Sequence, residues 1–254
     1  HGRDAGNGAS VVEAIEAAGS EGVFLRADFT DFTEVRTLAD EVGARLGTLD
    51  VLVNNAGAYF RTGALTDAGI ERTFAVNHLA PFLLTNRLGP VLAETGRVVT
   101  VASAVHRRED LDLSRVRTVE GYDGLAAYSR SKLANVLFTR ELARRLQGPT
   151  ANCLHPGLVP GSALWREAPW YVQFGVGLVD KLPRAVARWV AETPASGAET
   201  SVYLAAASDV ADVSGAYYVD CEPKTPSSTA RDDALAARLW DRSVELVDLE
   251  TSVA

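Results

Sequence analysis

Tyr128 and Lys132 stand four residues apart in a run that continues with apolar residues through Leu142 and therefore predicts a helix. Positions four apart lie on one face of a helix, so the phenol and the ammonium can converge on one point. A phenol with an ordinary pKa of about 10 exchanges protons poorly near neutrality, and a nearby cation favours its ionised form. The pair could therefore serve as an acid and a base, although a half-buried tyrosine beside a solvated lysine would have the same spacing.

Strands and helices alternate along the chain around this pair. The apolar runs predict strands at 23–28, 50–54, 97–102, 150–154 and 216–221, and the helical periodicities predict helices at 8–18, 32–46, 70–92, 128–146, 195–207 and 235–247. This alternation predicts an α/β fold with a doubly wound, mostly parallel sheet, formed as a single domain over residues 1–254. Residues 104–124 are polar and rich in turn formers, so they are expected to leave the scaffold as an excursion.

Unusual polar residues follow three of the predicted strands. They are the segment 54–57, Ser103 and the segment 155–157. The carboxyl ends of parallel strands share one edge of the sheet, and such folds bind ligands at that edge. We therefore expect these residues to meet the helix that carries Tyr128, which strengthens the chemical interpretation of the Tyr128–Lys132 pair.

Composition narrows the function to small-molecule chemistry. The net charge of −8 argues against binding to nucleic acid or to anionic membranes. No apolar run approaches the ~20 residues of a membrane span, and two cysteines cannot build a disulfide framework, so a cytoplasmic protein is expected. The four histidines, at 1, 78, 106 and 155, lack the spacing of metal ligands, so no metal site is expected.

Two segments near the C-terminus differ from the rest of the chain. Residues 158–192 place Trp165, Trp170, Tyr171, Phe174 and Trp189 among glycines and prolines. Such a segment suits an apolar lid over a hydrophobic substrate, and it equally suits an aromatic-rich interface or a satellite core. Residues 222–254 are expected to form a polar tail that ends in a helix.

Five motifs, taken in order, resemble those of the short-chain dehydrogenase/reductase family. They are Asn54-Asn55-Ala56-Gly57, Val76-Asn77-His78, Ser103, Tyr128-Ser129-Arg130-Ser131-Lys132 and Pro156-Gly157. The resemblance covers nearly the whole chain and is closest to the retinol-dehydrogenase-like subgroup, judged by the residues at 76–79 and 131–135 and by the long gap between Ser103 and Tyr128. It implies a Rossmann-type fold and an oxidoreductase that moves a hydride between NADP(H) and a hydrophobic alcohol or carbonyl compound.

The resemblance also implies roles for four catalytic residues. Tyr128 would be the general acid/base, and Lys132 would lower the pKa of that tyrosine and bind the nicotinamide ribose. Ser103 would hold the substrate carbonyl, and Asn77 would complete a proton relay through water. Two hydroxyl donors aimed at a carbonyl oxygen stabilise the negative charge that its reduction creates, whereas the hydride itself requires a cofactor.

The cofactor contacts implied by the resemblance begin at the N-terminus. Asp28 would contact the adenosine, and Arg3 lies where members that prefer NADP place a cation for the 2′-phosphate, which favours NADP over NAD. The remaining expected contacts are Asn55, Ala56, Gly57, Tyr128, Lys132, Pro156 and Gly157. A threonine that commonly follows this proline–glycine pair in the family is replaced by Gly161-Ser162, and Ser162 would have to substitute for it.

The glycine-rich phosphate loop of the family does not precede the first helix, and the chain begins at His1 with no methionine in it. We expect the given sequence to be N-terminally incomplete, because a sheet that lacks its central strands would leave unpaired backbone on two facing edges. The alternative is a reduced protein that binds no dinucleotide and uses Tyr128, Ser103 and Lys132 for cyclisation, dehydration or isomerisation. The resemblance is compatible with a homodimer or a homotetramer.

Overall fold

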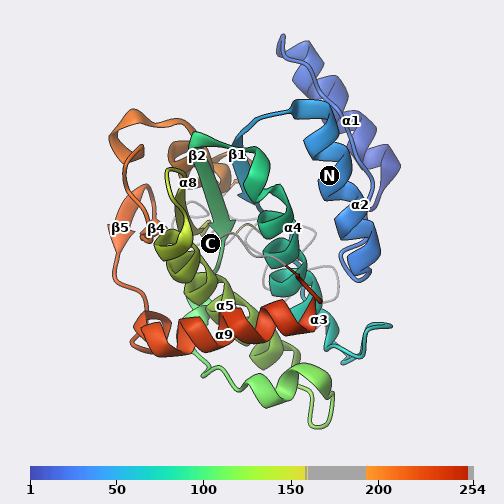
Figure 1. The fold of residues 1–254 in the computed structure, drawn as a ribbon, viewed down its shortest axis with the longest axis vertical. Coiled ribbons are helices and arrows are strands. Elements are labelled where there is room, and N and C mark those ends of the chain that lie inside the picture. The colour runs from blue at the N-terminus through green and yellow to red at the C-terminus, as the bar shows by residue number, and fades with distance from the viewer. Residues whose placement is uncertain (158, 160–192, 251–254) are drawn as a thin grey trace, which may run out of the picture.

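A computed structural model describes residues 1–157, 159 and 193–250 as an α/β fold around a central sheet (Figure 1). In the described residues the sheet has five strands in the order β1-β2-β3-β4-β5, with the first four parallel and β5 antiparallel to β4. The strands are β1 (Leu49–Asn54), β2 (Leu92–Val101), β3 (Thr150–His155), β4 (Tyr217–Val219) and β5 (Glu222–Lys224). The predicted fold class, a mostly parallel Rossmann-type sheet, is confirmed.

Helices cover both faces of this sheet, and the alternation of side chains along the strands shows how. Val98 belongs to the larger core cluster, formed with α2 (Phe32–Leu46), α4 (Ala80–Leu88) and α5 (Gly124–Arg145). The next residue, Val99, belongs to a second cluster with Leu204 of α8 (Pro194–Ala206). Successive strand side chains point to opposite faces, so apolar residues at both positions require a helix layer on each side.

Helix α2 begins and ends where local sequence signals place it. The Asp31 side chain accepts a hydrogen bond from the Thr33 N–H at 2.7 Å, which satisfies a free donor of the first turn. Gly47 follows the last turn with φ 66°, a conformation that glycine adopts without a Cβ clash. The predicted range 32–46 is therefore confirmed. Helix α1 (Ala5–Ala17) begins three residues earlier than predicted, capped by Asp4.

Three local predictions are wrong. Residues 23–28 do not form a strand, because their only ladder contact among the described residues is an isolated parallel bridge between Gly2 and Arg26. The predicted helix 70–92 is instead α3 (Arg72–Phe74), the π-helix η1 (Ala75–Leu79), α4 and a 3-10 turn at Gly89–Val91. Strand β2 begins at Leu92 rather than at residue 97, and its register against β1 shifts between Leu49 and Val51.

Helix α9 (Asp233–Leu246) packs across α5, below it in Figure 1. Its Trp240 ring lies 4.9 Å from the Phe82 ring and 6.0 Å from the Phe138 ring, centroid to centroid, and is almost fully buried. The predicted C-terminal helix is thus part of the core rather than a polar tail. No helix in the described part of the chain has the length and apolar character to cross a membrane. The expected lid at 158–192 lies outside the described residues except for Val159.

Candidate active site

Tyr128 and Lys132 lie in the first half of α5 with both side chains buried, 7% and 2% exposed respectively. The helix begins at Asp123, whose carboxylate accepts a hydrogen bond from the Ala126 N–H at 2.8 Å. Burial raises the pKa of Tyr128, and a side-chain hydrogen bond with Ser103 acts in the opposite direction. Burial therefore favours the neutral phenol, which can donate a proton, near pH 7.

The Lys132 ammonium lies 5.6 Å from the centre of the Tyr128 ring and donates a hydrogen bond to the Val101 carbonyl oxygen at 2.8 Å. Burial lowers the pKa of Lys132 to about 8, so the side chain is mostly protonated at pH 7. The sequence suggested that Lys132 would lower the pKa of Tyr128. In the structure burial of the phenol dominates instead, and the lysine is anchored to the end of β2.

Ser103 is placed by the end of β2 and by the turn that follows it. Strand β2 ends at Val101, and the 3-10 turn η3 (Ala104–Arg107) begins after Ser103, whose Oγ accepts the Val105 N–H at 3.5 Å. The backbone of Ser103 is extended, and the turn that follows it packs against α5. A parallel strand and a neighbouring helix thus bring together two residues that are 25 positions apart in the chain.

Asn77 is fully buried in the π-helix η1 and tied to two neighbouring segments. Its Oδ1 accepts the Ala58 N–H at 2.7 Å, while its Nδ2 donates to the Ala58 carbonyl at 2.9 Å and to Ser131 Oγ at 3.0 Å. Both amide hydrogens are used, and one lone pair of Oδ1 remains for a water molecule. Single π-turns recur at functional sites because they re-aim a side chain out of the regular helical ladder.

Gly57 leaves space beside the lysine and asparagine. A Cβ at position 57 would lie 3.2 Å from Lys132 Nζ and 3.7 Å from Asn77 Oδ1, so glycine keeps this approach open. The segment leaves β1 through Asn55, whose N–H donates to the Val53 carbonyl at 3.0 Å, and continues through the half-buried Ala56. An open approach to a cationic side chain is what a nicotinamide ribose needs, so these residues fit the expected cofactor.

Pro156 and Gly157 follow β3 at the same edge of the sheet. Gly157 has φ 77°, which a residue with a Cβ adopts only under strain. Helix α8 packs close to this bend, because a Cβ on Gly197 would lie 3.4 Å from the Pro156 carbonyl oxygen and 2.5 Å from Val159. Ser162, the expected substitute for the family's threonine, lies outside the described residues.

Arg3 and Asp28 form a second group near the N-terminus. Their charged groups lie 3.8 Å apart, with side chains 60% and 32% exposed. Asp28 is oriented by Thr30, whose N–H and Oγ both donate to Asp28 Oδ1 at 2.9 Å. The two residues expected to recognise the adenosine half of a cofactor are therefore neighbours, and their contacts are with each other rather than with Lys132 or Asn77.

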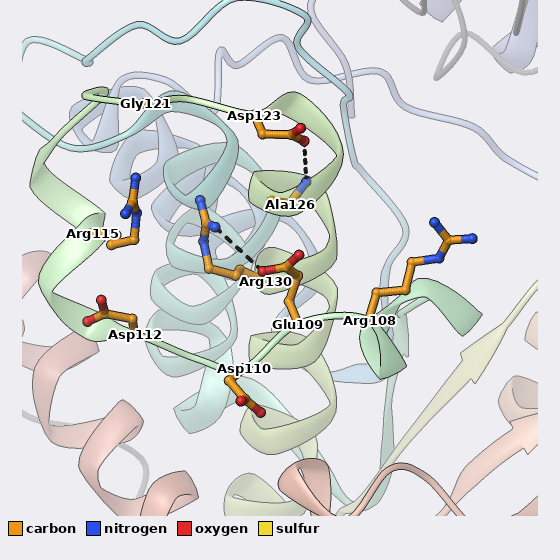
Figure 2. A pocket seen from close by; sticks show the side chains of 9 residues that line it. All are labelled: Arg108, Glu109, Asp110, Asp112, Arg115, Gly121, Asp123, Ala126 and Arg130. Carbon is orange, nitrogen blue, oxygen red and sulfur yellow. Dashed lines mark hydrogen bonds and ion pairs between the residues drawn. The ribbon is translucent and has the colours of Figure 1, made fainter.

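A polar cavity of about 510 Å³ lies on the far side of the first turns of α5 (Figure 2). Ala126 and Arg130 line it, and they are on the opposite face of the helix from Tyr128. The Arg130 guanidinium points to the Glu109 carboxylate at 3.9 Å, and Asp123 is used as the helix cap. Charged groups that already pair with one another at a wet surface make this cavity a poor place for hydride chemistry.

Sequence reasoning missed two residues of the site. Ser131 was quoted only as part of a motif, yet it links Asn77 to the Tyr128 backbone, since its Oγ donates to the Tyr128 carbonyl at 2.7 Å. His106 was assigned to an excursion off the scaffold, yet it is fully buried beside Ser103. His106 follows Ser103 by three residues, so a single turn brings its ring to the Ser103 backbone, and this spacing could have indicated that it belongs to the site.

Comparisons with known proteins agree with this geometry. A family model described as short chain dehydrogenase matches residues 1–170. Retinol dehydrogenase 14 of Homo sapiens is 40% identical over 226 residues, covering 87% of this chain and 66% of that protein, so the chain spans just under two thirds of the relative's length. A crystal structure of an uncharacterized Mycobacterium paratuberculosis protein superposes with a TM-score of 0.73 at 29% identity, covering 99% of this chain and 83% of the other. A Burkholderia cenocepacia short chain dehydrogenase in complex with NADP gives 0.62 at 26% identity, covering 91% and 85%.

Proposed function

This chain belongs to the short-chain dehydrogenase family, in its retinol-dehydrogenase-like subgroup, and we propose that it transfers a hydride between NADP(H) and a hydrophobic alcohol or carbonyl compound. The observation that carries the proposal is the buried group formed by Tyr128, Ser103 and Lys132 at the carboxyl edge of a parallel sheet. Tyr128 and Lys132 come from α5, Ser103 follows β2, and the Lys132 ammonium lies beside the open approach at Gly57.

In this proposal Tyr128 gives its proton to the carbonyl oxygen during reduction and takes it back during oxidation. The nicotinamide, when bound, supplies or accepts the hydride. Ser103 donates a second hydrogen bond to the same oxygen, so that two donors meet the charge as it develops. The buried ammonium of Lys132 stabilises the tyrosinate left behind, because its charge acts in a medium of low dielectric constant.

In the direction of reduction, a water molecule held by Asn77 then passes a proton from solvent back to Tyr128. The free Oδ1 lone pair of Asn77 binds this water molecule, and the contacts to Ala58 and Ser131 hold the amide in one orientation. Such an orientation matters because general acid–base catalysis depends on heavy-atom distances near 3 Å. Without this relay, reprotonation of a buried phenol after each turnover would require the site to open.

For the cofactor, we assign Lys132 and Tyr128 to the nicotinamide ribose and residues 55–57 to the adenosine side. We assign Pro156 and Gly157 to the edge of the nicotinamide ring. Asp28 and Arg3 are assigned to the adenosine end, with Arg3 favouring the 2′-phosphate of NADP. The NADP complex of the Burkholderia relative supports a phosphorylated cofactor. The guanidinium of Arg3 is exposed enough to rotate from Asp28 to a phosphate.

The proposed substrate class rests on the aromatic residues of the segment 158–192 and on the subgroup. Relatives named for retinol support a long apolar alcohol or aldehyde. A cytoplasmic location and a homo-oligomeric state belong to the same proposal.

The proposal is tested by titrating the 254-residue chain with NADPH and following nicotinamide fluorescence, then assaying reduction of all-trans-retinal. We expect saturable binding and NADPH-dependent formation of retinol, both in a folded, monodisperse sample. Absence of NADPH binding by such a sample would favour the cofactor-independent alternative, in which Tyr128, Ser103 and Lys132 catalyse a cyclisation, dehydration or isomerisation. The Tyr128→Phe variant separates the two steps, because it removes the proton donor and leaves the cofactor contacts assigned to Lys132 and to residues 55–57 in place.

A further inference from the structure

His106 lies between the Ser103 turn and a distant segment of the chain. Its Nδ1 is 2.7 Å from the Ser103 carbonyl oxygen, and its Nε2 is 3.2 Å from the Ser227 nitrogen. The ring is fully buried and packs edge-on against Tyr217 of β4, with centroids 5.0 Å apart. Both ring nitrogens therefore have a backbone partner, and the ring cannot turn without losing one of them.

The partners fix the tautomer of this histidine. The Ser227 N–H can only donate, so Nε2 must accept, and the remaining proton is on Nδ1, which donates to the Ser103 carbonyl. Burial lowers the pKa of His106, the hydrogen bond to Ser103 raises it and the charge of Arg107 lowers it. A neutral ring with one donor and one acceptor satisfies both contacts at once.

The distant segment, residues 225–229, is here called the strap, and it connects β5 to the turn before α9. Three side chains that follow Ser103 reach every second residue of the strap. Arg107 Nη2 donates to the Thr225 carbonyl at 2.5 Å, His106 accepts from Ser227, and Asp110 Oδ1 accepts from Thr229 Oγ1 at 3.1 Å. Of these three side chains, only His106 also forms a hydrogen bond with the Ser103 backbone.

We propose that His106 is a positioning residue for Ser103, fixing the backbone of the serine from one ring nitrogen while the strap holds the other. The proposal rests on the proposed function, because it gives the Ser103 hydroxyl a catalytic task. The Ser103 carbonyl and side chain share one Cα, so a carbonyl held at a fixed place limits the positions open to Oγ. The strap contact at Nε2 sets the tautomer that makes the bond to the Ser103 carbonyl, and the strap lies more than 120 residues from Ser103 in sequence.

Two substitutions separate the two contacts. In His106→Asn the side-chain amide occupies the place of Nδ1 and can still donate to the Ser103 carbonyl, whereas in His106→Gln it occupies the place of Nε2 and can still accept from Ser227. We expect His106→Gln to lower kcat for NADPH-dependent reduction of all-trans-retinal by about 10-fold or more, because small displacements of a catalytic donor have large effects. We expect His106→Asn to stay within about 3-fold of the wild-type kcat, with KM and the NADPH Kd of both variants within the same range.

Deuterium uptake gives a readout that does not depend on activity. His106→Gln should speed exchange in residues 101–107, and His106→Asn should speed exchange in the strap. Thr229→Val is the matched control, because it removes the Asp110 contact in the same strap and leaves both His106 bonds, so kcat should change by less than about 2-fold.

The outcomes separate this proposal from the proposed function. If Tyr128→Phe retains wild-type activity, the proposed function fails and the positioning role fails with it. If Tyr128→Phe is inactive while His106→Gln keeps wild-type kcat, only the positioning role is overturned. Equal losses of kcat in the Asn and Gln variants, in step with equal losses of Tm, would also overturn it, since a purely structural histidine would give that result.

Discussion

The two regions expected to hold the halves of a dinucleotide differ sharply in how the chain secures them. Around Tyr128 and Lys132 the side chains are buried, and the Lys132 ammonium is tied to the Val101 carbonyl oxygen. In residues 1–28 the only ladder contact is one bridge, Val11 and Val23 are 58% and 65% exposed, and the Arg3–Asp28 pair faces solvent. The proton-handling region is therefore fixed by the core, whereas the adenosine end is defined by a few surface contacts.

This difference shows what burial does for chemistry. A buried tyrosine and a buried lysine have displaced pKa values because water is excluded from them, and their positions depend on the packing of whole elements. An exposed ion pair adds little to stability and reorients easily. Substitutions in the first region should therefore change the chemical step, and substitutions in the second should change only cofactor preference.

The largest effect is expected for Tyr128→Phe. Removing the proton donor should lower kcat for retinal reduction by about 1000-fold, within the range measured for general acids, while the NADPH Kd changes little. Tyr122→Phe is the matched control: the Tyr122 hydroxyl donates to the Phe60 carbonyl at 2.9 Å and contacts Thr73 Oγ1, so its loss should lower Tm and leave kcat within about 2-fold. Equal activity in the two variants would contradict the assignment of the acid.

Lys132→Met should lower kcat/KM by about 100-fold, since it removes the charge that stabilises the tyrosinate. It also has a pH signature in stability. Burial lowers the pKa of Lys132 in the wild-type protein from 10.5 to about 8. Between pH 8 and pH 10.5 the folded state therefore binds fewer protons than the unfolded state, so the wild-type protein becomes more stable as the pH rises through this range. The stability advantage of Lys132→Met over wild type should shrink by up to about 3 kcal/mol between pH 7 and pH 10.5. Urea unfolding of both proteins at several pH values measures this, and parallel pH curves would show that Lys132 is not buried as a charge.

Gly57→Ala should weaken NADPH binding by about 10-fold, because the new Cβ lies 3.2 Å from Lys132 Nζ and the ammonium is tethered to Val101. Fluorescence titration with NADPH gives the value. Gly43→Ala on α2 is the control: its Cβ would meet nothing closer than Val91 at 3.9 Å, and the helix should gain up to about 1 kcal/mol in stability. An unchanged Kd in Gly57→Ala would remove the segment at 55–57 from the cofactor site.

The smallest effect is expected for Arg3→Ala, at the exposed end of the comparison. The ratio of NADPH to NADH affinity should fall by a few-fold to about 10-fold, and the free energy of unfolding should change by less than about 1 kcal/mol. Comparative titrations with the two cofactors measure the ratio. A change of more than about 100-fold in kcat would contradict this, because it would show that residues 1–28 contribute to the chemical step as the region around Tyr128 does.

Elements with strong local signals could be predicted from the sequence, as α2 shows with its cap at Asp31 and its terminal Gly47. The prediction of a strand at 23–28 was wrong because a strand depends on neighbours that local patterns do not show, and among the described residues only Gly2 pairs with this segment. The sequence also did not predict the π-turn at Asn77 or the early start of β2, because both depend on how a helix and a bulged strand fit the sheet.

The site residues at strand ends could be listed from the sequence, because topology brings those ends to one edge. Their mutual contacts could not. His106 lies three residues after Ser103, but its second ring nitrogen accepts from Ser227, a partner 121 residues away, and nothing local marks that pairing. The pKa of Tyr128 also depends on burial by the whole fold, which raises it and which a lysine four residues away in the sequence does not reveal.

The most direct test follows a label from cofactor to product. The 254-residue chain is incubated with all-trans-retinal and NADPH that carries deuterium at both C4 positions of the nicotinamide, and the product is analysed by mass spectrometry. The account predicts retinol with one deuterium on the carbon that bears the hydroxyl, formed by the wild-type chain and lost in Tyr128→Phe. Retinal left unreduced by a folded wild-type sample, or labelled retinol formed equally well by Tyr128→Phe, would contradict it.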